Sequence, residues 1–278
     1  DLDGNLPPER QYLPMEMKKL GYQTAMTGKW HLKKEPAAYD YYNVLPGQGH
    51  YFDPKFRVAD AGAWPNNFVQ HEGYVSDIIT DITLDYLEKR DKKKPFFLMH
   101  HHKAPHDDFE YPERYDSYLA DVDIPEPASL YSQPFFGSEA TLGRNGSLRD
   151  RIGSSVSSRH PYRSYAHQYG LDSVADENQR THLAFQEYTK RYLRCVKGVD
   201  DNLGRLFSYL KENDLWDNTI IVYTSDQGMM LGEHDYMDKR WMYEESMRMP
   251  FIMRFPDKIA AGSRTKAIVN NTDYAPTL

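Results

Sequence analysis

The 278-residue sequence lacks the features that would indicate disulfide cross-links, a repeat architecture or a membrane-spanning helix. A single cysteine, Cys195, excludes an intramolecular disulfide. No apolar run approaches the roughly 20 residues that a membrane-spanning helix needs, and there is no internal repeat or low-complexity run. The formal net charge of -7 gives a whole-molecule field that does not favour nucleic acid as a partner. What is present, 40% hydrophobic residues, is enough for a substantial core.

Both ends of the sequence are typical of a piece of a longer protein. The first residue is Asp1 rather than Met, and no signal-peptide pattern follows it. The last residues, NNTDYAPTL, look like a loop that enters a helix and is then cut off. We therefore expect a chain truncated at both ends, in which a removed signal peptide would leave no trace.

Apolar periodicity predicts alternating helices and strands along the chain. Helices are predicted over 13–20, 72–89 and 182–210. Short apolar strands are predicted over 22–28, 95–100, 219–225 and 250–255, the third a continuous run of the kind buried in a parallel sheet. Segments 36–70 and 120–170, rich in turn residues, are predicted to be loop. This order indicates an α/β fold with a mostly parallel central sheet flanked by helices.

Polar residues follow three of the predicted strands at the point where each strand ends. Lys29 and His31 come at the end of the first, His106 follows the second, and Asp226 with Gln227 follows the third. In α/β folds, ligands bind just beyond the carboxyl ends of the strands. The sequence therefore predicts a binding site built from these side chains.

The residue types at these strand ends favour hydrolysis of an anionic ester, either a phosphate or a sulfate. Asp226 and Gln227 offer the hard oxygen donors that suit Ca²⁺ or Mg²⁺. Lys29 and Lys239 are cations that could face an anionic group, and the two histidines could transfer protons near neutral pH. Taken singly, each residue also has a structural interpretation: a turn cap, a solvated surface charge or a packed imidazole.

Four stretches of the sequence resemble the type I sulfatases of the alkaline phosphatase superfamily, in family order from Leu6 to the last residue. They are GYQTAMTGKWHL, PFFLMHHHKAPHDDF, YTSDQGMMLGEHDYMDKRWMYEESMRMPFIMRFP and NTDYAPTL. The resemblance implies an alkaline phosphatase-like fold and a sulfuric ester hydrolase. It further implies that residues 1–278 are part of a sulfatase catalytic domain, without its N-terminal nucleophile segment and its C-terminal subdomain.

The resemblance also assigns roles to the charged residues at the strand ends. Asp226 and Gln227 are expected to bind one calcium ion, whose remaining ligands lie upstream of Asp1. Lys29 and Lys239 are expected to hold the sulfate oxygens.

The two histidines at the strand ends receive roles in turnover from the same resemblance. His31 is expected to assist breakdown of the covalent sulfate intermediate, and His106 to protonate or orient the leaving alcohol. Glu233 and His234 are expected to brace the loop after the metal ligands.

The nucleophile of the family has no counterpart in this sequence. It is a Cys or Ser oxidised to formylglycine within a C/S-x-P-x-R motif upstream of the K-W-H segment, and no such motif is present. Cys195 lies on the apolar face of the predicted long helix, where a buried thiol is the better interpretation. We expect the nucleophile upstream of Asp1, and no turnover by these 278 residues alone.

Three hypotheses for the whole protein follow from these motifs. The leading one is a hydrolase that removes sulfate from a sulfated polysaccharide or glycosaminoglycan, with a 6-sulfated amino sugar as one candidate substrate. The alternatives are a phosphodiesterase or phosphonate hydrolase of the same superfamily, and a non-catalytic glycan-binding remnant. By resemblance the protein is periplasmic or secreted, while its oligomeric state stays open.

A basic and aromatic rim in the segment 120–170 is the candidate for sugar recognition. Arginine pairs well with sulfate or carboxylate, and aromatic rings stack on sugar faces. A solvated loop is the competing interpretation of this segment. The candidate substrate-binding residues are Arg144, Arg149, Arg159, Arg163 and His160, with Tyr131, Tyr162 and His167 as aromatic neighbours.

Overall fold

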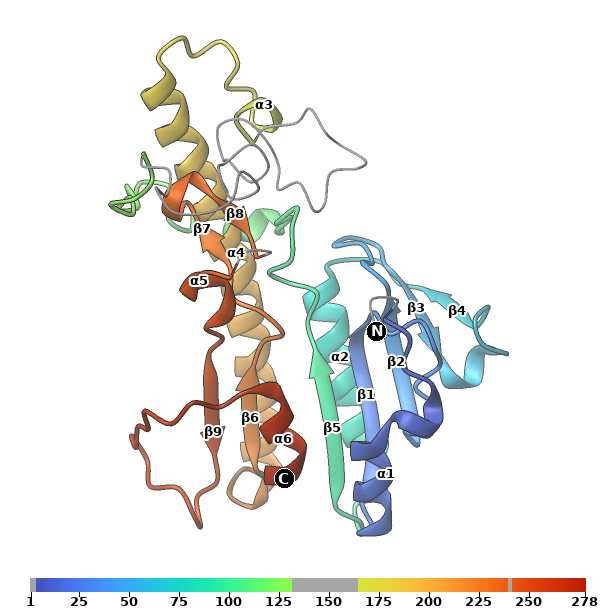
Figure 1. The fold of residues 1–278 in the computed structure, drawn as a ribbon. Helices are drawn as coiled ribbons and strands as arrows, with labels where there is room; N and C mark the ends of the chain where they lie inside the picture. Colours follow the sequence, from blue (N-terminus) through green and yellow to red (C-terminus); the bar gives the residue numbers. More distant parts are fainter. Residues whose placement is uncertain (1–3, 132–164, 240–241) are drawn as a thin grey trace. The chain divides into compact units, whose positions relative to one another are not determined.

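The computed structural model describes residues 4–131, 165–239 and 242–278 (Figure 1). The chain divides into two compact units. Unit 1 comprises Asp1–Pro112, Val196–Asn218 and Gly262–Leu278. Unit 2 comprises Glu113–Cys195 and Thr219–Ala261. The long helix α4 (Glu177–Glu212) contributes its first part to unit 2 and its second part to unit 1.

Unit 1 is built on a five-stranded sheet in the order β4-β3-β2-β1-β5. Its strands are β1 (Gln23–Trp30), β2 (Tyr41–Pro46), β3 (Lys55–Val58), β4 (Phe68–Gln70) and β5 (Phe96–His101). β1 pairs in parallel with β2 and with β5, whereas β3 and β4 extend the sheet in antiparallel pairings. The central parallel strands confirm the predicted α/β class.

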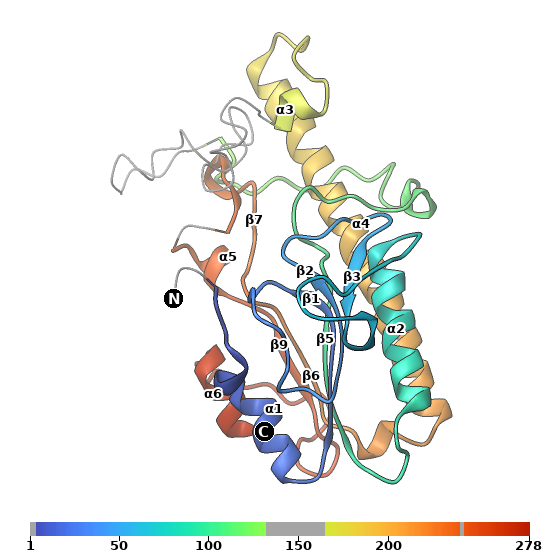
Figure 2. The ribbon, with the colours of Figure 1, turned by 90° about the vertical axis from the view of Figure 1, so that its right-hand side faces the viewer.

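Helices cover both faces of this sheet. The helices of unit 1 are η1 (Pro8–Arg10), α1 (Tyr12–Lys19), η2 (Ala59–Ala61), α2 (Val75–Lys89), the second part of α4, η5 (Trp216–Asn218) and α6 (Asn271–Thr277). Figure 2 shows α1 and α2 on opposite sides of the sheet. Asn202 of α4 donates a 2.8 Å hydrogen bond to Asp77 of α2, and Tyr209 donates one of 2.9 Å to Glu88. These polar contacts join α4 to α2.

The prediction of loop over 36–70 is wrong, because β2, β3 and β4 lie within it. Four consecutive residues of β2, Tyr42 to Leu45, are buried beside β1. Each of the three strands is short and is bounded by turn residues, so none displays a period of its own. Pairing decides their conformation: β2 pairs with β1, β3 with β2, and β4 with β3.

Unit 2 holds two small antiparallel sheets. The first pairs β6 (Ile221–Thr224) with β9 (Phe251–Arg254), and the second pairs β7 (Met230–Leu231) with β8 (Met237–Asp238). Short helices complete it: η3 (Glu113–Tyr115), α3 (Tyr165–Gln168), η6 (Glu233–Asp235) and α5 (Glu244–Met247). The prediction that β6 is buried in a parallel sheet is therefore wrong for the described residues. Its run of apolar residues was correct for a strand but did not specify the strand's partner or direction.

Two half-buried imidazoles, those of His100 and His102, lie side by side where β5 ends in unit 1. The Thr83 hydroxyl donates to the Ile79 carbonyl at 2.9 Å, so its oxygen accepts the Nδ1–H of His100 at 2.8 Å. The Nε2 atom of His100 is then an acceptor, and it lies 3.0 Å from Nε2 of His102. For two neutral rings, this network places the proton between them on Nε2 of His102.

Burial lowers the pKa of both imidazoles. The pKa of His100 falls well below 6.5, chiefly through desolvation and then through the charges of His102 and His101. The pKa of His102 falls to about 4, again chiefly through desolvation, with His101 lowering it further and Asp77 opposing the shift. Because the charged forms lack compensation by solvent, the folded state requires both rings to be neutral.

Acidification is expected to destabilise unit 1 through this histidine pair. A histidine whose folded-state pKa is lowered binds protons more tightly when unfolded, so its contribution to stability is complete above pH 6.5 and is lost as the pH falls towards 4. For His102 alone the loss is on the order of 3 kcal/mol. Urea unfolding at several pH values measures it. His102→Gln should flatten this pH dependence, whereas His50→Gln, at an exposed position, should retain it; equal slopes in the two variants would contradict the assignment.

Candidate functional site

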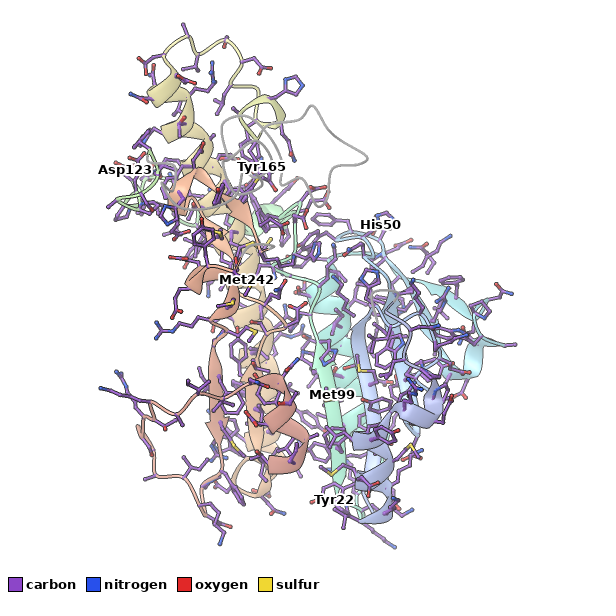
Figure 3. All side chains as sticks on the ribbon, viewed as in Figure 1. Tyr22, His50, Met99, Asp123, Tyr165 and Met242 are labelled. Carbon is purple, nitrogen blue, oxygen red and sulfur yellow. The ribbon has the colours of Figure 1, made fainter. Side chains whose placement is uncertain are left out.

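The carboxyl edge of the unit 1 sheet carries three of the predicted site residues. Lys29 is the penultimate residue of β1, His31 follows that strand, and His106 lies in the turn after β5. Figure 3 labels Tyr22, just before β1, and His50, just after β2, at opposite ends of this sheet. Since β1, β2 and β5 are parallel, the three side chains belong to the same end of the sheet as His50.

Lys29 is held by a residue that the sequence did not single out. Its Nζ atom donates a 3.1 Å hydrogen bond to the amide oxygen of Gln48. The loop after β2 brings Gln48 there because Trp30 pairs with Pro46 in the parallel register, and the Gly47 N–H donates to the Trp30 carbonyl at 3.1 Å. The only sequence signal for this contact is the Gly-Gln-Gly run directly after a buried strand.

His31 lies within electrostatic reach of two other site residues. Partial burial of its ring lowers its pKa, and the charges of Lys29, His106 and Lys33 lower it further, in that order. His31 is exposed, so its ring faces the solvent side of the sheet edge. The unprotonated ring that results is suited to accept a proton near neutral pH.

In unit 2, Asp226 and Gln227 lie exposed in the loop that follows β6. The next residue, Gly228, fastens this loop to the start of α5. Its N–H donates to the Ser246 carbonyl at 2.9 Å, and a Cβ atom at this position would lie 1.9 Å from the Glu245 carbonyl oxygen. Only glycine permits this approach. Asp226 and Gln227 therefore directly precede a residue whose backbone position is fixed by this contact.

Lys239 directly follows the small β7–β8 hairpin. Because Asp238 pairs with Met230, Lys239 lies at the same end of the hairpin as residues 226–229, which precede it. Its Nζ atom lies 3.7 Å from the Asp238 carboxylate, and the two side chains are only 12% and 11% exposed. Lys239 is thus a largely buried cation rather than a surface charge. Within the hairpin, the Glu233 carboxylate accepts the Leu231 N–H at 2.7 Å, which is the bracing contact expected of that residue.

The predicted site residues fall in both units. Lys29, His31 and His106 are in unit 1. They lie close enough together there for the charges of Lys29 and His106 to lower the pKa of His31. Asp226, Gln227 and Lys239 are in unit 2. That all six line one cleft stays a prediction. The candidate substrate-binding residues Arg144, Arg149, Arg159, Arg163 and His160 lie outside the described residues.

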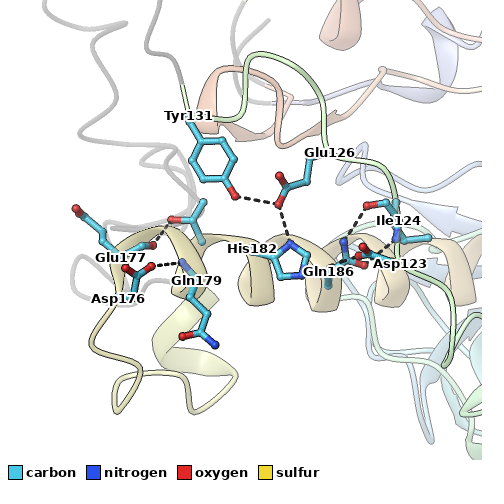
Figure 4. Close-up of polar contacts among 10 residues, drawn as sticks. Asp123, Ile124, Glu126, Tyr131, Asp176, Glu177, Gln179, His182 and Gln186 are labelled. Carbon is cyan, nitrogen blue, oxygen red and sulfur yellow. Dashed lines mark hydrogen bonds and ion pairs between the residues drawn. The ribbon is translucent and has the colours of Figure 1, made fainter.

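Two aromatic members of the predicted rim are described, Tyr131 and His167, and each contacts a carboxylate of its own unit. Figure 4 shows Tyr131 donating to Glu126 at 2.9 Å, while Nδ1 of His182 lies 2.8 Å from the same carboxylate oxygen. Burial raises the pKa of Tyr131 to about 12, and the bond to Glu126 adds to the shift. Gln186 binds both backbone groups of Ile124, at 2.8 and 2.9 Å, so this segment is fastened along α4.

The oxygen donors of the site suit a hard cation but do not complete its coordination. Asp226 and Gln227 supply a carboxylate and an amide oxygen, the ligand types that calcium prefers. Among residues 4–131, 165–239 and 242–278, no group of three or more His, Cys, Asp or Glu side chains is arranged to hold a metal ion. The donors that are present fit calcium, and further ligands have to come from other residues.

Comparison with known proteins settles the family. Residues 2–278 match the family model described as Sulfatase. The chain belongs to the sulfatase family. This sulfatase is 39% identical over 303 residues to an N-acetylglucosamine-6-O-sulfatase of Bacteroides thetaiotaomicron, a match that covers 97% of the chain and 53% of the relative. It is 27% identical over 281 residues to a putative extracellular sulfatase Sulf-1 homolog of Caenorhabditis elegans, covering 97% of the chain and 35% of that protein.

A solved structure agrees with this assignment. It is of a protein in complex with its substrate, D-glucosamine-2-N,6-O-disulfate, and superimposes with a TM-score of 0.80 at 36% identity. The match covers 95% of this sulfatase chain and 59% of the other. The chain therefore spans about half the length of these two relatives. Within the described part of the sulfatase, no helix is long and apolar enough to cross a membrane.

Proposed function

We propose that this sulfatase chain is part of an enzyme that hydrolyses a sulfate ester on a carbohydrate, with a 6-O-sulfated amino sugar as the substrate. The observation that supports the proposal most directly is the set Lys29, His31 and His106 at one sheet edge, in a chain 39% identical to an N-acetylglucosamine-6-O-sulfatase. A cation and two imidazoles provide the charge stabilisation and proton transfer that ester hydrolysis needs.

In this proposal the lysines bind the sulfate and the histidines move protons. Lys29, with its ammonium group oriented by Gln48, and Lys239 would each donate to sulfate oxygens. His106 would protonate the departing sugar alcohol, and His31, unprotonated at neutral pH, would accept a proton in the second half-reaction. The nucleophile is proposed to be a formylglycine upstream of Asp1, with residues 1–278 forming part of the catalytic domain.

Asp226 and Gln227 are proposed to bind one calcium ion, which would add positive charge close to the transferred sulfate. Both residues offer oxygen donors in an exposed loop directly before the backbone contact of Gly228. We further propose a periplasmic or secreted location, in line with the putative extracellular sulfatase of Caenorhabditis elegans that this chain resembles.

The substrate proposal is tested by a screen of defined sulfated sugars with the full-length protein. We expect release of inorganic sulfate from 6-O-sulfated N-acetylglucosamine and glucosamine, and much slower release from sugars sulfated at other positions. Aryl phosphodiesters and phosphonates form a second arm of the screen. Turnover confined to that arm would replace the proposal by the phosphodiesterase or phosphonate hydrolase alternative. If no substrate in either arm is hydrolysed, the glycan-binding alternative replaces it.

Calcium removal is expected to lower both thermal stability and activity of the full-length protein. A ligand at 100 times its Kd stabilises the folded state by about 2.7 kcal/mol, so calcium added after chelation should raise the Tm by several degrees. Asp226→Ala should abolish this calcium-dependent shift. Asp257→Ala removes a matched carboxylate from an exposed turn of the same unit and should keep the shift. An unchanged shift in the Asp226 variant would remove that residue from the metal site.

A further inference from the structure

The His106 ring faces two oxygen atoms of its neighbour Asp107 through the same nitrogen. Nδ1 lies 2.9 Å from the Asp107 carbonyl oxygen and 2.5 Å from its carboxylate oxygen Oδ1. The carbonyl oxygen can only accept a hydrogen bond from the ring, so Nδ1 carries the hydrogen in that bond, and the carboxylate oxygen lies beside it as an ion-pair contact. The other ring nitrogen, Nε2, is therefore the atom that gains or loses a proton.

The carboxylate lies close to the ring in a poorly solvated position. The side chains of His106 and Asp107 are only 19% and 15% exposed. A carboxylate so near Nδ1 attracts the hydrogen on that nitrogen, and reduced solvation strengthens that interaction. In the protonated state Nδ1–H stays on Asp107 while Nε2–H points to the other side of the ring. A histidine held in this way is prepared to donate a proton from Nε2.

The backbone of His106 is also fixed, independently of its side chain. Its N–H donates to the Lys103 carbonyl at 3.0 Å, and its carbonyl accepts the hydroxyl of Tyr51. Tyr51 is 2% exposed, and its own carbonyl accepts the N–H of Val75 at the start of α2 at 2.8 Å. The ammonium group of Lys103 lies 4.5 Å from the centre of the Tyr51 ring. The turn after β5 is thereby tied to a helix of the same unit, so the ring is anchored at both its backbone and Nδ1.

We propose that Asp107 is a positioning residue that makes His106 an effective proton donor to the leaving alcohol, an inference that rests on the proposed function. In the step concerned, the nucleophile's hydroxyl oxygen, already deprotonated, bonds to sulfur as the bond from sulfur to the alcohol oxygen breaks. The bonding electron pair goes to the alcohol oxygen, which takes the proton from Nε2 of His106. The ring becomes neutral and keeps Nδ1–H on Asp107 throughout. Asp107 itself neither gains nor loses a proton.

The dependence of the rate on the leaving group distinguishes this role from a structural one. A sugar alcohol is a poor leaving group that needs the proton, whereas 4-nitrophenolate departs without it. Asp107→Asn in the full-length protein should lower kcat on the 6-sulfated sugar by about 10- to 100-fold, within the range ascribed to acid catalysis. On 4-nitrophenyl sulfate the loss should stay below about 3-fold. The ratio of the two rates is taken within one preparation, so a reduced folded fraction cancels from it.

Asp108→Asn is the matched control, because it removes a carboxylate one residue away that is exposed. That variant should keep the wild-type ratio. Tyr51→Phe deletes only the hydroxyl that binds the His106 carbonyl, and it should move the ratio in the same direction as Asp107→Asn. Equal losses on both substrates in Asp107→Asn, or the same altered ratio in Asp108→Asn, would overturn the inference. A wild-type protein that hydrolyses neither sulfate would overturn the proposed function itself.

Discussion

Gly28→Ala is expected to destabilise unit 1 by about 3 kcal/mol or more, with loss of the folded protein at moderate urea concentrations. Gly28 pairs with His101 across the parallel β1–β5 ladder, at a φ of 88° that side-chain-bearing residues rarely adopt. A Cβ atom there would lie 1.9 Å from the His101 carbonyl oxygen and 2.8 Å from its carbonyl carbon. Both atoms are backbone, so relief requires the two strands to separate. That separation would also displace Lys29, the next residue of β1.

A second glycine, Gly21, allows the cost of the close contact to be measured apart from the cost of the backbone conformation. Gly21 has a similar φ of 85°, but no atom lies within 4 Å of the Cβ that alanine would add. Gly21→Ala therefore carries only the strain of the left-handed backbone, about 1–2 kcal/mol. Urea unfolding of both variants measures the difference. If the two alanine variants lose similar stability, the contact with His101 does not limit this position.

Replacement of Lys239 is expected to lower turnover by on the order of 10²-fold, as when one preorganised donor is removed from a site that stabilises charge. The lysine side chain is only 12% exposed, and its ammonium group lies 3.7 Å from the Asp238 carboxylate. Lys239→Ala deprives that poorly solvated carboxylate of this cation, so a stability loss of about 1–3 kcal/mol accompanies the loss of activity. Lys239→Arg should rescue only partly, because a planar guanidinium does not fit where a compact ammonium does.

The double variant Asp238→Asn with Lys239→Ala separates the two effects. Without the charge on Asp238 the unfolding free energy should recover, whereas kcat/KM on the sulfated sugar should stay low. The measurements are kcat/KM and thermal unfolding on the same samples of the full-length protein. Wild-type kinetics in either alanine variant would remove Lys239 from the sulfate site.

The sequence by itself determined the elements whose signal is local. Apolar residues that recur three or four positions apart predicted α2 and α4. These helices place Ile79 and Cys195 in the core, both 0% exposed. The apolar runs of β1 and β5 predicted both strands and the polar residues at their ends. The final helix was readable from NNTD, because Asn270 and Asp273 form a capping box. The resemblance of four stretches to known sulfatases also indicated the family, which the comparisons confirm.

Only the tertiary structure decided which segments meet. β2 to β4 carry no period of their own, and the pairing that defines them is with residues distant in the chain. β6 was readable as a strand, yet its antiparallel partner β9 was not, because an apolar run records burial and not direction. Gln48 contacts Lys29, and Asp107 contacts Nδ1 of His106, only because the loops that carry them fold back at the sheet edge. Such contacts depend on register and on backbone angles in turns, and neither leaves a pattern in the order of residue types.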